Sequence, residues 1–292
     1  MQAGEPSRTA WAAACYRAAH QVLEQGRIFA DPLALRIVGQ DADALARWAE
    51  EQSSGRRMRI FIAVRTRFAE DALAAAYERG VRQLVVLGAG LDTYAYRGAL
   101  RDGLRIWEVD HPATQAWKRQ RLADAGIPLP AALTFAPVDF EQETLAEGLA
   151  AAGFDTREQT FFTWLGVVPY LTEAAVWSTL GYIAGLLQGA HVVFDYADPP
   201  QSLPPEMRTD HERRAARVAE AGEAFRSYFE SEALRARLMD LGFHEVEDLG
   251  PPQMAARYFP NRVASMPEKG GHVVRASTGG ACDPKRKSDR LD

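Results

Sequence analysis

The chain has 292 residues, of which 47% are hydrophobic, so it can bury a sizeable core and is neither disordered nor fibrous. Its 34 basic and 39 acidic residues give a net charge of -5, which offers no general attraction to nucleic acid or to anionic membranes. No apolar run approaches the roughly 20 residues of a membrane helix, and no basic cluster marks a signal peptide. We therefore expect a cytoplasmic protein whose partner is a small molecule.

The two cysteines, Cys15 and Cys282, lie near opposite ends of the chain. Neither belongs to a CxxC pair, and neither has a partner at the spacing of metal ligands. We expect two reduced thiols, with no disulfide and no metal site.

The first 80 residues carry the start and stop signals of helices. Four helices are predicted there, beginning at Ser7 or Thr9, at Asp31-Pro32, at Asp41 or Asp43, and at about Arg57. In the fourth, apolar residues recur near a 3.6-residue period as far as Arg79, and Gly80 is a natural stop. We expect residues 1–56 to form a helical lid.

From residue 83 onward short apolar segments alternate with helical ones, which is typical of a parallel sheet covered on both faces. Seven strands are predicted, at Gln83–Leu87, Arg105–Val109, Leu133–Val138, Phe161–Leu165, His191–Tyr196, Glu245–Asp248 and His272–Ala276. The helices between them are predicted at Pro112–Ala125, Gln142–Ala152, Glu173–Leu187 and Ser231–Leu241. The fold class is therefore α/β, with one domain over residues 1–276 and a disordered polar tail over residues 277–292.

Four prolines interrupt the segment Asp198–Pro205, which can continue neither a strand nor a helix. A charged helix is predicted after it, at about Glu206–Ala221. This insert, residues 198–230, leaves the carboxyl end of a strand, where open α/β sheets bind ligands, so one interpretation is a cap over the substrate. The other interpretation is a solvated surface helix, and the sequence favours neither.

A buried strand runs into a glycine turn at Val86-Leu87-Gly88-Ala89-Gly90. Glycines let the backbone approach a ligand closely and adopt conformations that other residues resist. About 20 positions later Asp110 ends the second strand, where a carboxylate can accept hydrogen bonds from ribose hydroxyls. The combination of turn and carboxylate indicates a site for adenosine.

Two further observations distinguish between adenosine cofactors. A dinucleotide fold prefers glycine or alanine three positions after Gly90, where this chain has Thr93, and this counts against NAD. The third strand ends at Asp139-Phe140, where a carboxylate can accept the adenine amino group and an aromatic ring can cover the base. These features favour S-adenosylmethionine as the cofactor.

Several separated motifs support this interpretation. They are Ala30-Asp31-Pro32-Leu33-Ala34, Arg65-Thr66-Arg67-Phe68, Val86–Thr93, Glu108-Val109-Asp110-His111-Pro112, Val138-Asp139-Phe140, and Trp164-Leu165-Gly166-Val167 leading to Tyr170-Leu171. Because it carries these motifs in this order, the chain resembles the leucine carboxyl methyltransferases and their bacterial polyketide-linked relatives. The resemblance implies a Rossmann-like class I methyltransferase fold, with a seven-stranded, mostly parallel sheet, an antiparallel last strand and an N-terminal helical lid.

The resemblance also implies which residues bind the cofactor. They are Arg65 or Arg67, Gly88, Ala89, Gly90, Asp110, His111, Asp139, Phe140 and Trp164. One of the two arginines would hold the carboxylate of the cofactor, which suits a bidentate guanidinium. Alternatively, Arg65 and Arg67 pair with Glu70 and Asp71 as ordinary helix neighbours.

The chain departs from the family pattern at two positions. Tyr94 stands where the family often has arginine, and Leu165 stands where it often has glutamate. By the resemblance that glutamate would face the amino group of the cofactor. Backbone carbonyls of the Gly88 turn can serve in its place.

The sulfonium of S-adenosylmethionine is already activated, so catalysis mainly requires alignment of donor and acceptor and exclusion of water. We expect O-methylation of a small molecule in secondary metabolism, with a carboxylate favoured as acceptor because it is ionised without a base. A phenol or alcohol would require a base. Candidates for the acceptor pocket are His111, Tyr170, Asp195 and Tyr196.

Each pocket candidate has a structural alternative. His111 can cap a helix, Tyr170 can pack under the lid, and Asp195 needs a partner in an apolar strand. Two other classes of protein remain open, an NAD-dependent oxidoreductase and a non-catalytic protein that keeps the methyltransferase fold as a binding module. A six-stranded parallel sheet without a terminal hairpin would favour the oxidoreductase.

Overall fold

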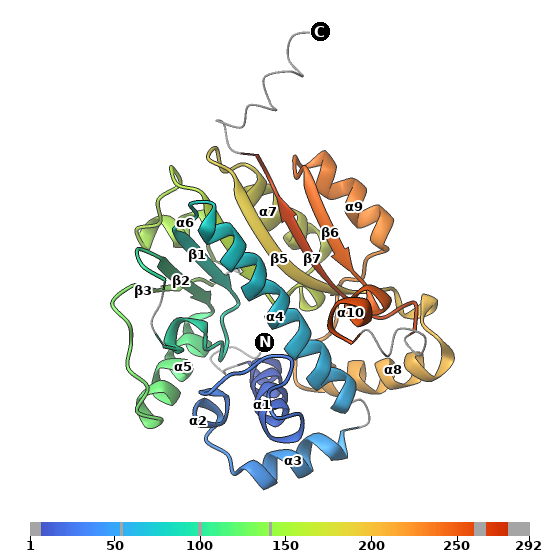
Figure 1. The fold of residues 1–292 in the computed structure, drawn as a ribbon. Coiled ribbons are helices and arrows are strands. Elements are labelled where there is room, and N and C mark those ends of the chain that lie inside the picture. The colour runs from blue at the N-terminus through green and yellow to red at the C-terminus, as the bar shows by residue number, and fades with distance from the viewer. Residues whose placement is uncertain (1–6, 53–54, 99–100, 140–141, 260–266, 280–292) are drawn as a thin grey trace.

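A computed structural model describes residues 7–52, 55–98, 101–139, 142–259 and 267–279. A central sheet of seven strands has the order β3-β2-β1-β4-β5-β7-β6 (Figure 1). The strands are β1 (Gln83–Leu87), β2 (Arg105–Asp110), β3 (Leu133–Pro137), β4 (Thr160–Trp164), β5 (Ala190–Ala197), β6 (Glu245–Leu249) and β7 (Gly271–Ser277). Strands β1 to β5 are parallel, whereas β7 is antiparallel to both of its neighbours. The predicted sheet with an antiparallel last strand is confirmed.

Helices cover both faces of the sheet. They are α1 (Arg8–Leu23), α2 (Ala34–Val38), α3 (Ala42–Glu51), α4 (Gly55–Glu78), α5 (Pro112–Asp124), α6 (Leu145–Ala151), α7 (Glu173–Ala184), α8 (Pro205–Glu220), α9 (Ser231–Asp240) and α10 (Pro251–Tyr258). On β1, Leu84 and Val86 pack with α4, while Val85 and Leu87 pack with the residues of α6, α7 and α9. Because strand side chains alternate between faces and both faces are covered, the four consecutive residues Leu84–Leu87 are all apolar.

The N-terminal helices lie at one end of the sheet, below it in Figure 1. Asp31, 2% exposed, attaches them to the loop after β1. Its Oδ2 lies 2.8 Å from Arg17 Nε of α1 and accepts a hydrogen bond from the Thr93 hydroxyl at 2.6 Å. Arg17 Nη2 in turn donates to the Leu91 carbonyl at 2.5 Å. The predicted lid is therefore joined to the glycine turn through a buried ion pair.

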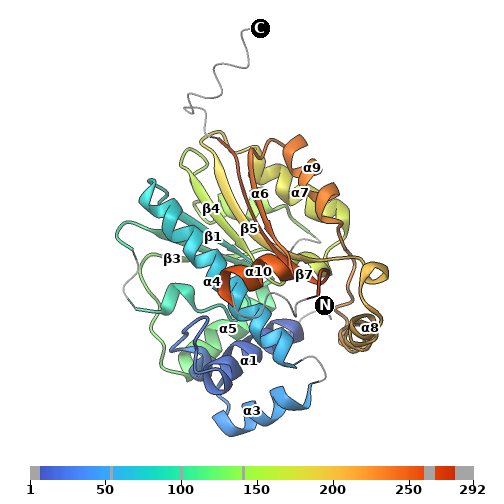
Figure 2. The same cartoon turned by 45° about the vertical axis from the view of Figure 1, so that its right-hand side comes forward.

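The insert helix α8 lies beside the same end of the sheet (Figures 1 and 2). Its chain then returns past the first turn of α1, where Glu223 accepts hydrogen bonds from the Arg8 and Thr9 amides at 2.9 and 3.0 Å. Ser227 Oγ donates to the Val168 carbonyl at 2.8 Å. The insert is thus attached to the N-terminal helices and to the loop after β4.

Most predicted boundaries agree with the structure. Every predicted strand begins and ends within one residue of the observed strand, and Ser7 and Asp41 are the caps of α1 and α3. The prediction for α6 began too early, because Thr144 forms a capping box and the helix begins after it. The tail was predicted to begin at Ser277, which is wrong because β7 includes this residue and the Thr278 amide donates to the Ala190 carbonyl. Residues 280–292 lie outside the described part.

Within the described ranges, none of the helices combines the length and the apolar character required to span a bilayer. The same residues contain no group of three or more His, Cys, Asp or Glu side chains placed to bind a metal ion. Cys15, the cysteine that falls within these ranges, is a buried free thiol, and burial raises its pKa to about 12.

Removal of the Asp31 carboxylate tests its anchoring role. Asp31→Ala leaves Arg17 buried without its counter-ion, so we expect a loss of about 3–5 kcal/mol in the free energy of unfolding. Asp41→Ala, which removes the exposed cap of α3, should cost only about 1 kcal/mol. Urea unfolding followed by circular dichroism measures both. Equal losses in the two variants would contradict the buried anchor.

Candidate functional site

The chain between β1 and η1 (Tyr94–Tyr96) makes a glycine turn at the carboxyl end of the sheet. Gly88 and Gly90 have φ values of +63° and +44°, a region that side chains disfavour. A Cβ on Gly88 would lie 2.3 Å from the Val167 side chain, and one on Gly90 would lie 3.0 Å from Cβ of Ala10. Ala89 between them is buried. The turn therefore needs glycine for both its conformation and its close packing.

The Asp110 carboxylate lies directly beside this turn. Its Oδ2 accepts a hydrogen bond from the Gly90 amide at 2.6 Å, and its Oδ1 accepts one from the His111 amide at 2.7 Å. Burial raises the pKa of Asp110, and the two backbone donors oppose that shift. A carboxylate has about four acceptor positions, so each oxygen retains one for a further donor. Two vicinal hydroxyls fit this remaining capacity.

His111 and Asp139 continue the site across β2 and β3. His111 is the N-cap of α5, where its Nδ1 accepts a hydrogen bond from the Ala113 amide at 3.2 Å. Its Nε2 lies 4.0 Å from Asp139 Oδ2, which also accepts a hydrogen bond from Gln142 Nε2. The structure thus brings together the carboxylates predicted for ribose and adenine. Phe140, predicted to cover the adenine, lies outside the described residues.

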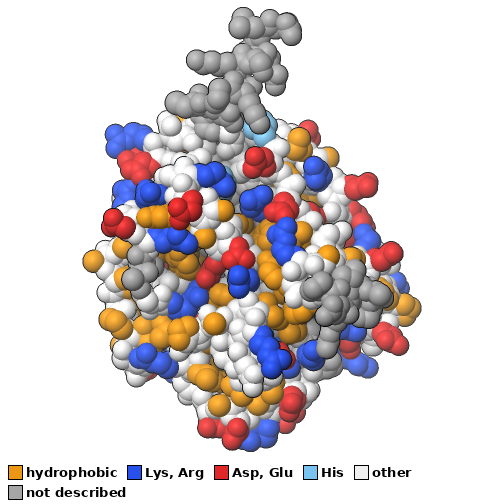
Figure 3. All heavy atoms as spheres, in the orientation of Figure 1, with side chains coloured by type: hydrophobic (Ala, Val, Ile, Leu, Met, Phe, Trp, Pro, Cys, Tyr) orange, Lys and Arg blue, Asp and Glu red, His pale blue; other side chains and the backbone are white. Residues whose placement is uncertain are grey.

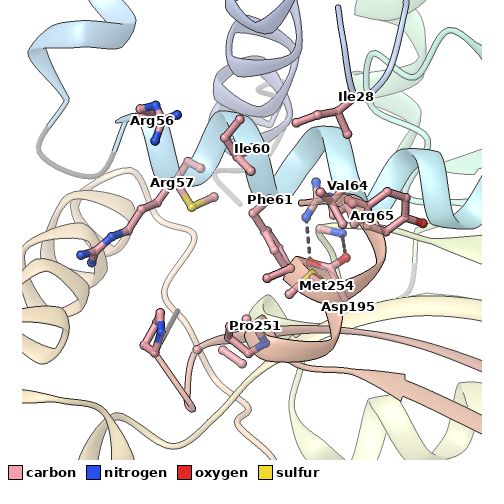
Figure 4. Close-up of a pocket in the computed structure, with 18 of the residues that line it drawn as sticks. Ile28, Arg56, Arg57, Ile60, Phe61, Val64, Arg65, Asp195, Pro251 and Met254 are labelled. Carbon is pink, nitrogen blue, oxygen red and sulfur yellow. Dashed lines mark hydrogen bonds and ion pairs between the residues drawn. The ribbon is translucent and has the colours of Figure 1, made fainter. Parts of the chain in front are cut away.

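The two candidate arginines of α4 have different surroundings. Arg65 is buried, and its Nη1 lies 2.7 Å from Asp195 Oδ2 of β5 (Figure 4). Its Nε is also buried and has no hydrogen-bond partner. Arg67 is half exposed and donates through Nε to both oxygens of Asp71 at 2.8 Å. The alternative of a helix-neighbour pair thus describes Arg67, whereas Arg65 pairs across the fold and keeps an unused donor.

The loop after β4 connects the glycine turn with the surroundings of Asp195. The Gly166 amide donates to Asp195 Oδ1 at 2.5 Å, and Val167 packs on Gly88. A Cβ on Gly166 would lie 2.7 Å from the Arg65 guanidinium. One short loop therefore contacts both the predicted donor site and the Arg65–Asp195 ion pair.

A cavity of about 1490 Å³ opens on the far side of this ion pair. It is lined by α4, α8, α10, the end of α1, and the carboxyl end of β5. Ile60, Phe61 and Val64 of α4 and Met254 of α10 give it apolar walls (Figure 4). On the surface, apolar side chains lie within a hollow that has basic and acidic side chains around it (Figure 3). The lining by α8 favours the interpretation of the insert as a cap.

Three of the four predicted pocket residues line this cavity. Tyr170 and Asp195 line it, and the Tyr170 ring lies 5.2 Å from that of Phe225 in the insert. Tyr196 also lines it, and its hydroxyl donates to Asp248 at 2.6 Å. Trp164, predicted to contact the cofactor, is 3% exposed and belongs to the core on the other face of the sheet.

The two departures from the family pattern lie next to each other. Tyr94 and Leu165 line the same small cavity of about 20 Å³ beneath α4, together with Glu70. Glu70 forms an ion pair with Arg97. Tyr94 and Leu165 are thus neighbours beneath α4, which their separation in the sequence does not reveal.

A buried charged cluster lies at the ends of β5, β6 and β7, and its Asp198 lines the cavity. His272 Nδ1 lies 2.9 Å from Asp248 Oδ1, and its Nε2 lies 3.0 Å from Asp198 Oδ2. Asp198 is also paired with Lys269, and Tyr196 stacks on His272 at 4.6 Å. Burial alone would lower the pKa of His272, but the two carboxylates outweigh it and raise the pKa to about 9. Sequence analysis missed this cluster, because its members are separated in the chain and form no motif.

The parallel sheet, the glycine turn and the carboxylates at the strand ends together define a class I methyltransferase domain. The chain belongs to the leucine carboxyl methyltransferase family, whose model matches residues 10–184, more than half of its length. The predicted family and fold are confirmed.

Three relatives illustrate the family, each named "putative S-adenosyl-L-methionine-dependent methyltransferase". YktD of Bacillus subtilis (strain 168) is 34% identical over 200 residues, which cover 68% of this chain and 66% of YktD. A protein of Mycobacterium avium (strain 104) is 33% identical over 70% of this chain and 68% of its own length. Franean1_4929 of Parafrankia sp. (strain EAN1pec) is 39% identical over 56% of this chain and 54% of its own length. The matches thus span about half to two thirds of these relatives.

Solved structures share the fold. A crystal structure described as a putative methyltransferase from Thermobifida fusca YX superposes with a TM-score of 0.58 and 17% identity, covering 96% of this chain and 97% of that chain. The CurJ carbon methyltransferase gives a TM-score of 0.51 with 16% identity, covering 93% and 67%. At these identities the likeness supports the fold alone.

The His272 cluster predicts a stability that depends on pH. Because the folded protein raises the pKa of His272 from about 6.5 to about 9, the stabilisation is complete below pH 6.5 and is lost as the pH rises through 9. We expect the free energy of unfolding to fall by up to about 3 kcal/mol across this range. Urea unfolding at a series of pH values measures it.

Two variants separate this effect from other titrations. His272→Gln should be less stable at pH 7 and should lose the slope, whereas His244→Gln, an exposed position, should keep the wild-type profile. An unchanged slope in His272→Gln would show that another group is responsible.

Proposed function

We propose that this chain is an S-adenosylmethionine-dependent O-methyltransferase that acts on the carboxylate of a small molecule. The observation that carries the proposal is the Asp110 carboxylate, held by the amides of Gly90 and His111 with an acceptor position left on each oxygen. The family membership and the names of the relatives support the cofactor. The resemblance to the polyketide-linked branch favours secondary metabolism, in the cytoplasm.

Different residues would bind the different parts of the cofactor. Asp110 would accept the ribose hydroxyls, and Asp139 the adenine amino group. Gly88 and Gly90 would lie against the methionine part, where no side chain obstructs it. The buried Nε of Arg65 would donate to the cofactor carboxylate, because it is an unused donor beside the loop that packs on Gly88.

Bound in this way, the cofactor would supply an activated methyl group. The chain has to place an acceptor oxygen opposite the sulfur and keep water away. A carboxylate acceptor needs no base, which agrees with the bonding of Asp195, because both of its oxygens are already occupied by Arg65 and Gly166. Tyr170, at the junction of the loop and the cavity, would contact the acceptor. The insert helix α8 would cover it.

The antiparallel pair β6–β7 and the family match both speak against the rival assignment as an NAD-dependent oxidoreductase. A non-catalytic binding module was the other rival. Tyr94 and Leu165, the two departures from the family pattern, lie beneath α4, and the hydrogen bond between Asp110 and the glycine turn is present beside them. These departures therefore provide no argument for a lost activity.

Removal of the Asp110 carboxylate tests the proposed cofactor site. We expect Asp110→Ala to weaken binding of S-adenosylhomocysteine by about 1.5–3 kcal/mol, because a charged acceptor for two hydroxyls is lost. Isothermal titration calorimetry measures the dissociation constant. Asp124→Ala, which removes an exposed carboxylate of α5, should bind like the wild type. Equal affinity in all three proteins would show that the ribose is bound elsewhere.

A further inference from the structure

The charges that line the large cavity do not cancel. Its lining carboxylates, Glu24, Asp195, Asp198 and Asp210, all have basic partners. Seven arginines line it, namely Arg27, Arg56, Arg57, Arg65, Arg67, Arg214 and Arg257. Within the described residues, four of them pair with carboxylates. Of the remaining three, Arg27 and Arg56 are exposed to solvent, and the third is Arg214.

Arg214 lies on α8 and is only partly exposed. Its Nε is buried without a hydrogen-bond partner, and its Nη1 donates to the Met58 sulfur at 2.7 Å. A thioether is a weak acceptor, so this guanidinium lacks a strong one. No carboxylate of the described chain forms an ion pair with it, and burial lowers its pKa. A cation with a buried donor and no counter-ion is costly, which makes a binding site for an anion the expected use.

Aromatic rings surround this cation. Arg214 lies over the Phe225 ring at 5.1 Å, and Tyr170 and His211 pack against Phe225 at 5.2 and 5.4 Å. His211 cannot share the charge, since burial and Arg214 lower its pKa to about 4. Its Nε2 is hydrogen bonded to the Tyr228 hydroxyl at 2.9 Å. The surroundings of Arg214 are therefore flat and aromatic, with an uncharged imidazole stacked on the Phe225 ring.

We propose that Arg214 is the residue that selects the acceptor, by binding the anionic group of a small aromatic acid whose ring packs against Phe225 and Tyr170. This inference rests on the proposed function, because it names the acceptor of the same site. Arg214 comes from the insert helix, so the insert would provide substrate specificity as well as cover.

Two fluorescent probes that differ by one anionic group test the proposal. 8-Anilino-1-naphthalenesulfonate carries a sulfonate, and N-phenyl-1-naphthylamine is its neutral counterpart. We expect wild-type protein to bind the sulfonate more tightly, with an affinity that weakens as sodium chloride is added. Arg214→Gln should weaken sulfonate binding about tenfold or more and leave binding of the amine unchanged. Arg217→Gln, an exposed arginine of the same helix, should match the wild type for both.

Three results would overturn the proposal. They are a wild-type protein that binds both probes equally, sulfonate binding that survives Arg214→Gln, and a variant that loses both probes to the same extent. If Arg214→Gln does not fold, Arg214→Lys is used instead. It keeps the charge and should retain both the preference for the sulfonate and the salt dependence of the wild type. Calorimetry with S-adenosylhomocysteine distinguishes failure of this inference from failure of the proposed function. Cofactor binding without a sulfonate preference leaves the proposed function standing and removes this inference alone.

Discussion

The site depends on one carboxylate that binds two backbone amides. Asp110 accepts from Gly90 and from His111, and it thereby fixes the turn after β1 to the end of β2. Without this bridge two glycines with positive φ would have many conformations available. The bridge also determines the chemistry, because it leaves the carboxylate half used and facing the place where the parallel strands end. A ligand with two neighbouring hydroxyls completes its hydrogen bonding.

The loop after β4 connects the glycine turn with the cavity. Val167 packs on Gly88, and Gly166 binds Asp195, which holds Arg65. The Arg65–Asp195 ion pair lines the large cavity and is connected to the glycine turn through Gly166 and Val167. The insert reaches the same loop through Ser227 and the N-terminal helix through Glu223, so lid, cap and turn form one connected unit. Domain closure around a substrate would have to move these elements together.

The sequence predicted well what depends on local pattern. Strand positions follow from runs of apolar residues, and the glycine turn with Asp110 forms a motif within about 20 residues. It predicted poorly what depends on distant partners. Glu70 was one expected partner of Arg65, but the residue that pairs with it, Asp195, lies 130 positions away, and the contact of Arg65 with the cofactor stays a prediction. The cluster of His272 with Asp198 and Asp248 is likewise absent from any local pattern, because sheet topology creates it.

The central claim is that a glycine turn and two carboxylates hold one nucleoside with its sulfur toward the cavity. A crystal structure of the complex with S-adenosylhomocysteine tests it most directly. The account predicts both ribose hydroxyls on Asp110, adenine beside Asp139, and the sulfur opening past the Gly166 loop toward Tyr170 and Arg214. A nucleoside bound away from Asp110, or a sulfur that faces the opposite side of the sheet, would contradict it.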